Sequence, residues 1–240
     1  MKKYIVYIKC LLLIALVGFL YGFSSQRNAT RIVKESVIEF ANGENLFLSH
    51  EMVNKLLIQN HGALKNKAKS LINLHELENV VFSNSLVEEA KIFLTIDGVV
   101  KTVVTQRTPV ARVNTGVEVY YIDKQGLKMP LSENYSARVL LVSGSVQKAD
   151  VASIYALVSF VQKNEFLKKM IVGIEKKAEN DYVLQTRVYN QKIQLGAIRD
   201  LDIKFKKLEA FYNEVIQNNE VEKYKTINLK YNNQVVCTKD

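Results

Sequence analysis

The chain has 240 residues, 48 % of them hydrophobic and 24 % charged, and carries a formal net charge of +9. This length suits one or two compact domains, and the hydrophobic share is large enough for a core. Nucleic-acid binding has little support, because no arginine cluster is interleaved with aromatic residues. The mild positive bias fits anionic lipid headgroups or a partner with acidic patches better. The two cysteines, Cys10 and Cys237, stand near opposite ends of the chain, so we expect no disulfide between them.

The most informative stretch is an apolar run at residues 5–23. As a helix it would measure roughly 28 Å, close to the thickness of the hydrocarbon layer of a bilayer. Lys2 and Lys3 precede the run, and the positive-inside rule keeps such an end in the cytoplasm. The rest of the chain then lies on the outer side of the membrane. The expected parts are a short cytoplasmic start at 1–3, a single transmembrane anchor at 4–23 and a linker at 24–30.

A cleaved signal peptide is the alternative for this run, since it shares the basic start and the apolar middle. The run has no proline, and residues 21–25 (YGFSS) form a poor small-residue cleavage site. These features favour an uncleaved anchor. Gly18 and Gly22 form a GxxxG pattern that could seat a second membrane helix closely, although two incidental glycines would look the same.

Residues 31–107 have the pattern of a small α+β module, in which two helices cover one face of a three-stranded sheet. Ser49 can cap a helix, and Asn73 stands three residues before Glu76, the spacing of a capping box. From residue 90 apolar and polar residues alternate, and an Asp-Gly turn separates two such stretches. The expected order is a strand at 31–40, a helix at 49–62, a second helix from 73, and strands at 90–96 and 99–106.

Residues 108–240 have the pattern of a mostly antiparallel β domain with two helices. Thr108 and Pro109 interrupt the preceding strand, and turn residues separate the strands that follow. The helices are expected to begin at Asp150 and Asp202. The strands are expected at 117–122, 138–142, 170–177, 182–189 and 191–195, followed by one long alternating strand at 226–238. The chain is therefore predicted to be α+β, with a single N-terminal transmembrane helix.

No residue pattern indicates an enzyme. The sequence has no GxSxG stretch, P-loop or glycine-rich dinucleotide loop. His50 precedes a glutamate but lacks the second histidine, four residues on, of a zinc-binding helix. Asp200 and Asp202 are better explained as residues that begin a helix than as a catalytic pair. We therefore predict no catalytic residue, no bound metal and no cofactor.

Several stretches of the second domain carry a family resemblance. They are YYIDKQG at 120–126, MPLS at 129–132 and VLLVSG at 139–144, with RTPVAR at 107–112 before them and INLKYNN at 227–233 near the end. With these stretches in this order, the chain resembles the FtsQ/DivIB family of bacterial cell-division proteins. The likeness extends over the whole chain: a single span, a POTRA-like module and a β domain.

The resemblance implies a non-enzymatic scaffold of the divisome, in the inner membrane at the division septum, that links early and late division proteins. Such a scaffold binds membrane-anchored partners of the FtsB and FtsL type, which add a strand to the edge of its β domain, and takes no small-molecule substrate. Carried over to this sequence, the partner edge falls on 226–238. Arg187 and Lys192, on the neighbouring hairpin, could pair with acidic residues of a partner. The candidate edge residues are Tyr224, Ile227, Leu229, Tyr231, Val235 and Val236.

Two alternatives stay open at this point. Ile227 and Leu229 could be ordinary core residues of an inner strand. The whole chain could also be an anchored envelope carrier or assembly factor that holds a lipid or a transiting polypeptide on its sheet. A carrier needs an apolar groove, whereas the scaffold needs a free sheet edge. An anchored hydrolase has the least support, because the sequence shows no site for it.

Overall fold

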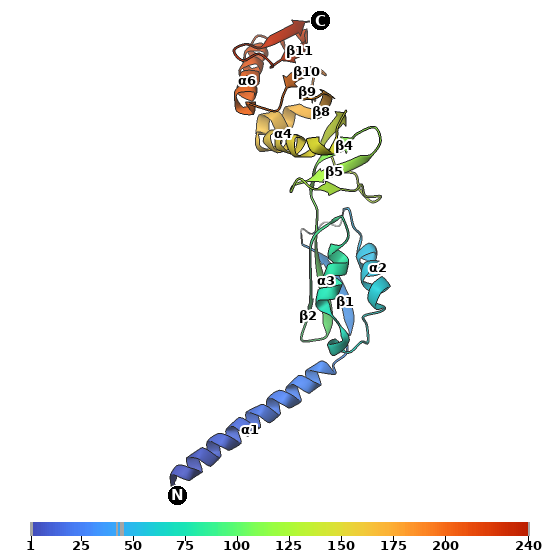
Figure 1. Cartoon of the computed structure of the whole chain (residues 1–240), viewed down its shortest axis with the longest axis vertical. Helices are drawn as coiled ribbons and strands as arrows, with labels where there is room; N and C mark the ends of the chain where they lie inside the picture. Colours follow the sequence, from blue (N-terminus) through green and yellow to red (C-terminus); the bar gives the residue numbers. More distant parts are fainter. Residues whose placement is uncertain (1, 42, 44–45, 240) are drawn as a thin grey trace. The chain divides into compact units, whose positions relative to one another are not determined.

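The computed structural model describes residues 2–41, 43 and 46–239, and for residues 2–6, 29, 60 and 61 it describes the backbone alone. The chain divides into two compact units, Met1–Gln106 and Arg107–Asp240 (Figure 1). Within the described residues, the first unit holds a sheet of three strands and the second a sheet of nine. The fold class is α+β, as the sequence predicts.

Helix α1 (Lys2–Ala29) begins the first unit. Its stretch Tyr7–Asn28 has a mean hydropathy of 1.9, and the described part of the protein buries none of it. A helix of a soluble protein buries its apolar face, whereas a membrane span exposes that face to lipid. The helix includes the predicted span at 4–23 and fits a single-pass membrane anchor. It also continues through residues 24–29, where the sequence predicts a linker.

Beyond α1, the first unit has the predicted order of one strand, two helices and two strands. β3 is the central strand of its sheet: β1 pairs with it in parallel and β2 antiparallel. A short 3-10 helix, η1 (Lys69–Leu71), lies between the two helices. The other elements are β1 (Glu35–Phe40), α2 (His50–His61), α3 (Leu74–Phe82), β2 (Val87–Leu94) and β3 (Val99–Gln106).

Both predicted helix caps of this unit are confirmed. The side chains of Ser49 and Asn73 each accept a hydrogen bond, at 3.2 Å, from the backbone N–H three residues further along the chain. These bonds satisfy donors that the first turn of a helix leaves unpaired. Helix α3 then buries Leu77 and Val81, which places its apolar side toward the sheet.

The sheet of the second unit has the strand order β12-β11-β10-β9-β8-β7-β4-β5-β6 in the described residues. Five neighbouring pairs are antiparallel and three are parallel, so the sheet is mostly antiparallel. Its strands are β4 (Pro109–Asn114), β5 (Val119–Asp123), β6 (Lys128–Met129), β7 (Leu140–Gly144), β8 (Ile171–Ala178), β9 (Asp181–Thr186), β10 (Lys192–Gly196), β11 (Tyr224–Asn228) and β12 (Val236–Lys239). Its helices are α4 (Val151–Lys163), α5 (Glu165–Met170) and α6 (Leu201–Gln217), with 3-10 helices η2 (Lys148–Asp150) and η3 (Val221–Lys223).

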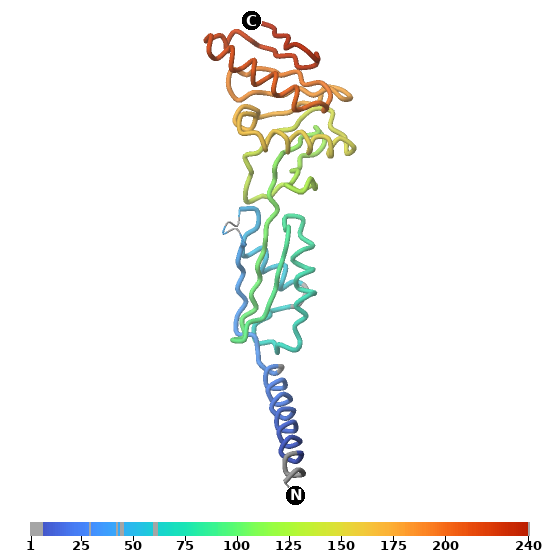
Figure 2. The backbone as a smooth tube through the Cα atoms, turned by 90° about the vertical axis from the view of Figure 1, so that its left-hand side faces the viewer, coloured from blue at the N-terminus to red at the C-terminus, as the bar shows by residue number. Residues whose placement is uncertain are grey.

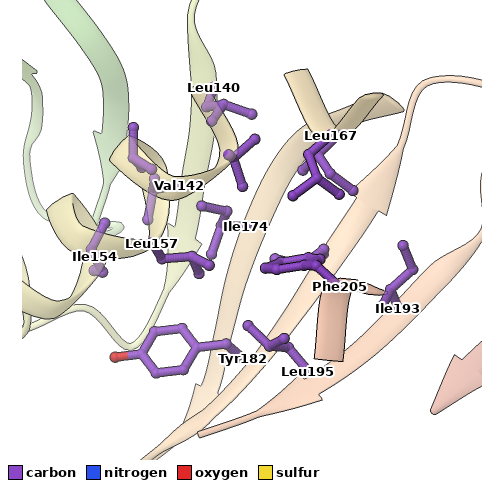
Figure 3. Packing of buried hydrophobic residues seen from close by; sticks show 14 of the residues in the cluster. Leu140, Val142, Ile154, Leu157, Leu167, Ile174, Tyr182, Ile193, Leu195 and Phe205 are labelled. Carbon is purple, nitrogen blue, oxygen red and sulfur yellow. The ribbon is translucent and has the colours of Figure 1, made fainter. Parts of the chain in front are cut away.

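The core of the second unit lies between its helices and its sheet. Figure 3 shows side chains from β7, β8 and β10 meeting those of α4 and α6. Phe205 of α6 stacks on Phe160 of α4, with ring centroids 5.3 Å apart. Leu157, Ile174 and Leu195 are fully buried in the same cluster. This packing holds α6 against the strands that end the sheet.

Three local features of this unit differ from the sequence prediction. Pro109 begins β4, an unpredicted strand, because proline is tolerated as the first residue of a strand. Helix α5 is a third helix, and its first turn is capped by Asn164. Asp150 does not cap α4 with its side chain. Instead its carboxylate accepts hydrogen bonds from the backbone of Gln147 and from the Lys176 ammonium.

The largest difference is at the C-terminal end, where the prediction of one long strand at 226–238 is wrong. The chain forms two strands, β11 and β12, which pair antiparallel as a hairpin, drawn in red in Figure 2. β11 ends where the Asn228 side chain accepts a hydrogen bond from the N–H of Lys230 at 2.9 Å, as in an Asx turn. The Lys207 ammonium of α6 then binds carbonyl oxygens of the loop, that of Tyr231 at 2.5 Å. These contacts turn the chain back on itself.

Candidate partner-binding edge

Strand β12 stands at one end of the nine-stranded sheet. It pairs antiparallel with β11, and in the described part of the chain no strand covers its other side. β11 is an inner strand, since β10 pairs in parallel with its opposite side. An uncovered strand presents unpaired backbone N–H and C=O groups, which form a template for the addition of another strand.

The direction of the backbone groups in β11 follows from one hydrogen bond. The N–H of Leu229 donates to the carbonyl oxygen of Gln194 in β10 at 2.9 Å. Successive residues of a strand direct their backbone groups to opposite neighbours. Thr226 and Asn228 therefore direct theirs to β12.

The antiparallel register carries this pattern into β12. Val236 and Thr238 stand opposite the two residues of β11 that face β12, so these pairs exchange hydrogen bonds. Cys237 stands between them, and its N–H and C=O point to the uncovered side. Its side chain is half-buried against the core, and burial raises the pKa of the thiol. The accessible part of Cys237 is therefore its backbone.

The structure separates the predicted edge residues by burial. Ile227 and Leu229 are fully buried in the core, so core packing, the alternative considered for them, is what the structure shows. Tyr231 and Val236 are 51 % and 42 % exposed. Val235 is half-buried and packs against the core just before β12. Contact with a partner stays a prediction for all of these residues.

Tyr224, at the start of β11, is half-buried and supports the far end of the hairpin. Its ring meets that of Phe211 edge to face, with centroids 5.2 Å apart. The ammonium of Lys239, at the end of β12, lies 5.1 Å from the centre of the same ring. Both strands of the hairpin are thus fixed at this end by one aromatic side chain.

Arg187 and Lys192 are exposed but do not lie in β12. Lys192 is in β10, opposite Thr226 of the inner strand β11. Arg187 follows β9, and its Nε donates to the carbonyl oxygen of Lys169 at 3.0 Å. The structure does not bring these two residues to the uncovered edge, and an ion pair with a partner stays a prediction for them.

The predicted glycine pair lies on one side of α1. Gly18 and Gly22 have no described atom within 4 Å of the place where a Cβ would stand. A second helix could therefore approach this side closely. Packing of the anchor against another membrane helix stays a prediction.

Two cavities lie beside the hairpin. The first, of about 620 Å³, is next to the loop that leads into β12. Lys204 of α6 lines it and donates from its ammonium to the carbonyl oxygens of Leu195 (2.9 Å) and Ala197 (2.8 Å). Burial lowers the pKa of Lys204. Lys207, in the same wall, binds the loop, so both lysines hold the backbone around the hairpin.

The second cavity, of about 720 Å³, lies beside η3, just before β11. Gln191, which the sequence analysis missed, is buried at this cavity. Its amide donates to the carbonyl oxygens of Val221 and Tyr224, both at 2.8 Å, and its oxygen accepts from the Tyr212 hydroxyl at 2.5 Å. Burial raises the pKa of Tyr212. The apolar and aromatic lining consists of Phe166, Met170, Val188, Tyr189, Tyr212, Ile216 and Val221.

The family-like stretch at 120–126 has a structural role. Asp123 is 1 % exposed, and its Oδ2 lies 2.8 Å from Nη1 of Arg107. Its Oδ1 accepts the backbone N–H groups of Gln125 and Leu127 at 2.9 and 2.8 Å. A carboxylate with these bonds fixes the turn between β5 and β6.

Metal binding would require a cluster of His, Cys, Asp or Glu side chains. Among residues 2–41, 43 and 46–239, no three His, Cys, Asp or Glu side chains gather in a way that could hold a metal ion. Asp200 and Asp202 lie at the start of α6, where the sequence predicts helix-start residues. Lys204, Lys207 and the Gln191 amide donate to backbone carbonyl oxygens around the hairpin, which is a structural use.

A protein-family model described as FtsQ/DivIB, C-terminal related, matches residues 108–238. No curated protein matches the chain. The matched region covers more than half of the 240 residues and includes the hairpin with the uncovered edge. FtsQ/DivIB proteins are non-enzymatic scaffolds of cell division, and a single membrane-anchoring helix suits them. The chain therefore belongs to the FtsQ/DivIB, C-terminal related, family.

Proposed function

We propose that the protein is a membrane-anchored divisome scaffold that binds partners of the FtsB and FtsL type by strand addition along β12. The observation that carries the proposal is the direction of the Cys237 N–H and C=O, toward the uncovered side of the sheet. A partner strand would pair with these groups, and its alternate side chains would select the partner.

The hairpin supports the proposal because it is held before a partner arrives. Ile227 and Leu229 anchor β11 in the core, and Tyr224 contacts Lys239 at the end of β12. An edge that is already ordered loses less conformational entropy when a strand is added to it. Strand addition at β12 would therefore require ordering of the partner alone.

The remaining parts of the chain complete the proposal. Residues 1–3 are cytoplasmic, 4–23 span the inner membrane, and the rest of the chain lies in the periplasm at the division septum. Residues 31–107 form a POTRA-like domain and 108–240 the partner-binding β domain. The protein links early and late division proteins without catalysing a reaction.

An anchored carrier or assembly factor is the second candidate. The apolar cavity of about 720 Å³ favours it, because this volume suits an acyl chain or apolar peptide side chains. The two candidates place the ligand on different residues. A carrier would depend on Ile216 in the cavity wall, whereas the scaffold would depend on the backbone of Cys237.

The test is capture of partners by the tagged full-length chain from detergent-solubilised membranes. Cys237→Pro removes the N–H on the uncovered side, where edge strands tolerate proline, and Cys237→Ala keeps that N–H. We expect the proline variant to recover small single-span coiled-coil proteins at least about tenfold less well, and the alanine variant to match wild type.

Loss of capture is informative only if both Cys237 variants stay folded. Both Cys237 variants should unfold within about 1 kcal/mol of the wild type, because the bonds between β11 and β12 are retained. Undiminished capture by a folded Cys237→Pro protein would contradict strand addition at β12. Recovery of lipid without such proteins, lost in Ile216→Glu, would favour the carrier.

A further inference from the structure

Three segments of the first unit carry exposed apolar side chains and lie near the C-terminal end of α1. We name them the tether-proximal surface: Arg31 and Ile32 after α1, Lys69 and Leu71 of η1, and Ile96 between β2 and β3. Ile96, Leu71 and Ile32 are 81 %, 77 % and 51 % exposed. A contiguous exposed apolar patch marks an interaction site, whereas single exposed apolar side chains do not.

Hydrogen bonds fix these three segments to one another. The N–H of Lys69 donates to the carbonyl oxygen of Arg31 at 2.9 Å. The Lys69 ammonium donates to the carbonyl oxygens of Thr95 (2.9 Å) and Ile96 (3.3 Å), and the Arg31 guanidinium also donates to that of Ile96 at 3.3 Å. The β-bridge between Ile32 and Ala68 adds a further link. The segments that carry the apolar side chains are therefore held together where α1 meets the rest of the unit.

The covalent connection to α1 keeps this surface close to the membrane. The apolar run ends at Phe23, and α1 continues to Ala29. Those six further residues add roughly 9 Å, at about 1.5 Å each. The headgroup layer on one side of a bilayer is roughly 5–8 Å thick. Arg31 therefore follows at the outer limit of the headgroups. Ile96 lies closer to the acyl chains, because it lines one pocket with Tyr21 and Phe23 at the end of the apolar run.

The charge of these segments favours anionic lipid as the occupant. The segments 27–32, 67–71 and 95–98 carry the apolar side chains of this surface. They contain four basic residues, Arg27, Arg31, Lys67 and Lys69, and one acidic residue, Asp97. Basic residues next to exposed aliphatic ones are typical of surfaces that lie at the boundary between headgroups and acyl chains.

We infer that the tether-proximal surface docks onto anionic phospholipids of the bilayer that holds α1, with Leu71 and Ile96 inserted toward the acyl chains. Docking gives the first unit a fixed place on the membrane. The inference requires only that α1 spans the membrane, so it is independent of the partner-binding edge.

The test uses the full-length chain in nanodiscs that contain brominated phosphatidylcholine with phosphatidylglycerol. The sequence has no tryptophan, so one introduced tryptophan is a unique fluorescent probe. Ile96→Trp and Leu71→Trp place it on the surface. Phe82→Trp is the matched control. Phe82 is 55 % exposed, like the test positions, but it lies at the far end of α3, the helix that begins just after η1.

If the surface docks, brominated acyl chains should quench the probes at positions 96 and 71 at least twofold. The emission of these two probes should also shift to shorter wavelength, because they leave water. The probe at position 82 should show neither change. Replacement of phosphatidylglycerol by phosphatidylcholine should weaken the quenching. Acrylamide access equal to that of the control at positions 96 and 71 would overturn the inference. A shift to shorter wavelength without quenching by bromine would also overturn it, because a protein would then cover the surface.

Discussion

Two edge strands, β2 of the first sheet and β12 of the second, differ in character. Strand β2 ends the sheet of the first unit with eight residues, and β12 ends that of the second with four. At β2, the N–H of Ile92 donates to the Glu78 carboxylate of α3 at 2.7 Å. At β12, the N–H of Cys237 points to the uncovered side. One N–H of the β2 edge is bonded to the protein's own side chain, whereas the N–H of Cys237 has no strand beside it in the described residues.

Charge adds to the protection of β2. Glu88, Glu89 and Lys91 stand within it, whereas Lys239 is the one charged residue of β12. Exposed edges invite unwanted association, and proteins commonly protect them with charges or a covering helix. Within the described residues β12 lacks these protections, which leaves room for the strand addition proposed above.

The largest effect should come from separating the open edge from the core. Leu229→Pro removes both the N–H that binds Gln194 and a fully buried side chain. We expect a loss of about 3–5 kcal/mol in the free energy of unfolding, measured with denaturant. Leu229→Met keeps the N–H and nearly the same volume and should cost less than about 1.5 kcal/mol. A loss below about 1 kcal/mol in Leu229→Pro would show that the hairpin does not depend on this contact with β10.

Opening the closed edge should have an intermediate effect. Glu78→Ala leaves the partly buried N–H of Ile92 without its acceptor, at a cost of about 1–3 kcal/mol. Concentration-dependent association, seen by light scattering of the protein in detergent, should appear with it. Glu78→Gln retains an acceptor and should change the free energy of unfolding and the association less than Glu78→Ala does. If the Glu78→Ala protein stays monodisperse, the charged residues within β2 are enough to protect this edge.

Local signals in the sequence predict much of this fold. The apolar run gives α1, and Ser49 and Asn73 mark the starts of two helices. The predicted strands at 170–177 and 182–189 form the hairpin of β8 and β9, which turns at Asn180 with a φ of 54° that asparagine tolerates. Each of these features depends on residues close together in the chain.

The character of the two edges could not be predicted, because it depends on distant residues. The alternation of Ile227, Leu229 and Tyr231 suits a strand of any length, so it does not show where β11 ends. The loop between β11 and β12 is held by Lys207 of α6, which is distant in the sequence. Glu78 belongs to a helix pattern whose polar side would be assigned to solvent, yet its carboxylate binds a strand that follows it. Sequence patterns alone give no register and no contact between elements.

The smallest effect concerns the side of β12 that faces the core. Burial raises the pKa of the Cys237 thiol, so the unfolded chain releases this proton at a lower pH than the folded protein does. The stability from the buried thiol is therefore present below the unfolded pKa and lost as pH rises through the folded value. From about pH 8.5 to 10, we expect the unfolding temperature to fall a few degrees more in wild type than in Cys237→Ala. Equal falls would mean that the thiol is solvated and that β12 is open on its side-chain face as well as along its backbone.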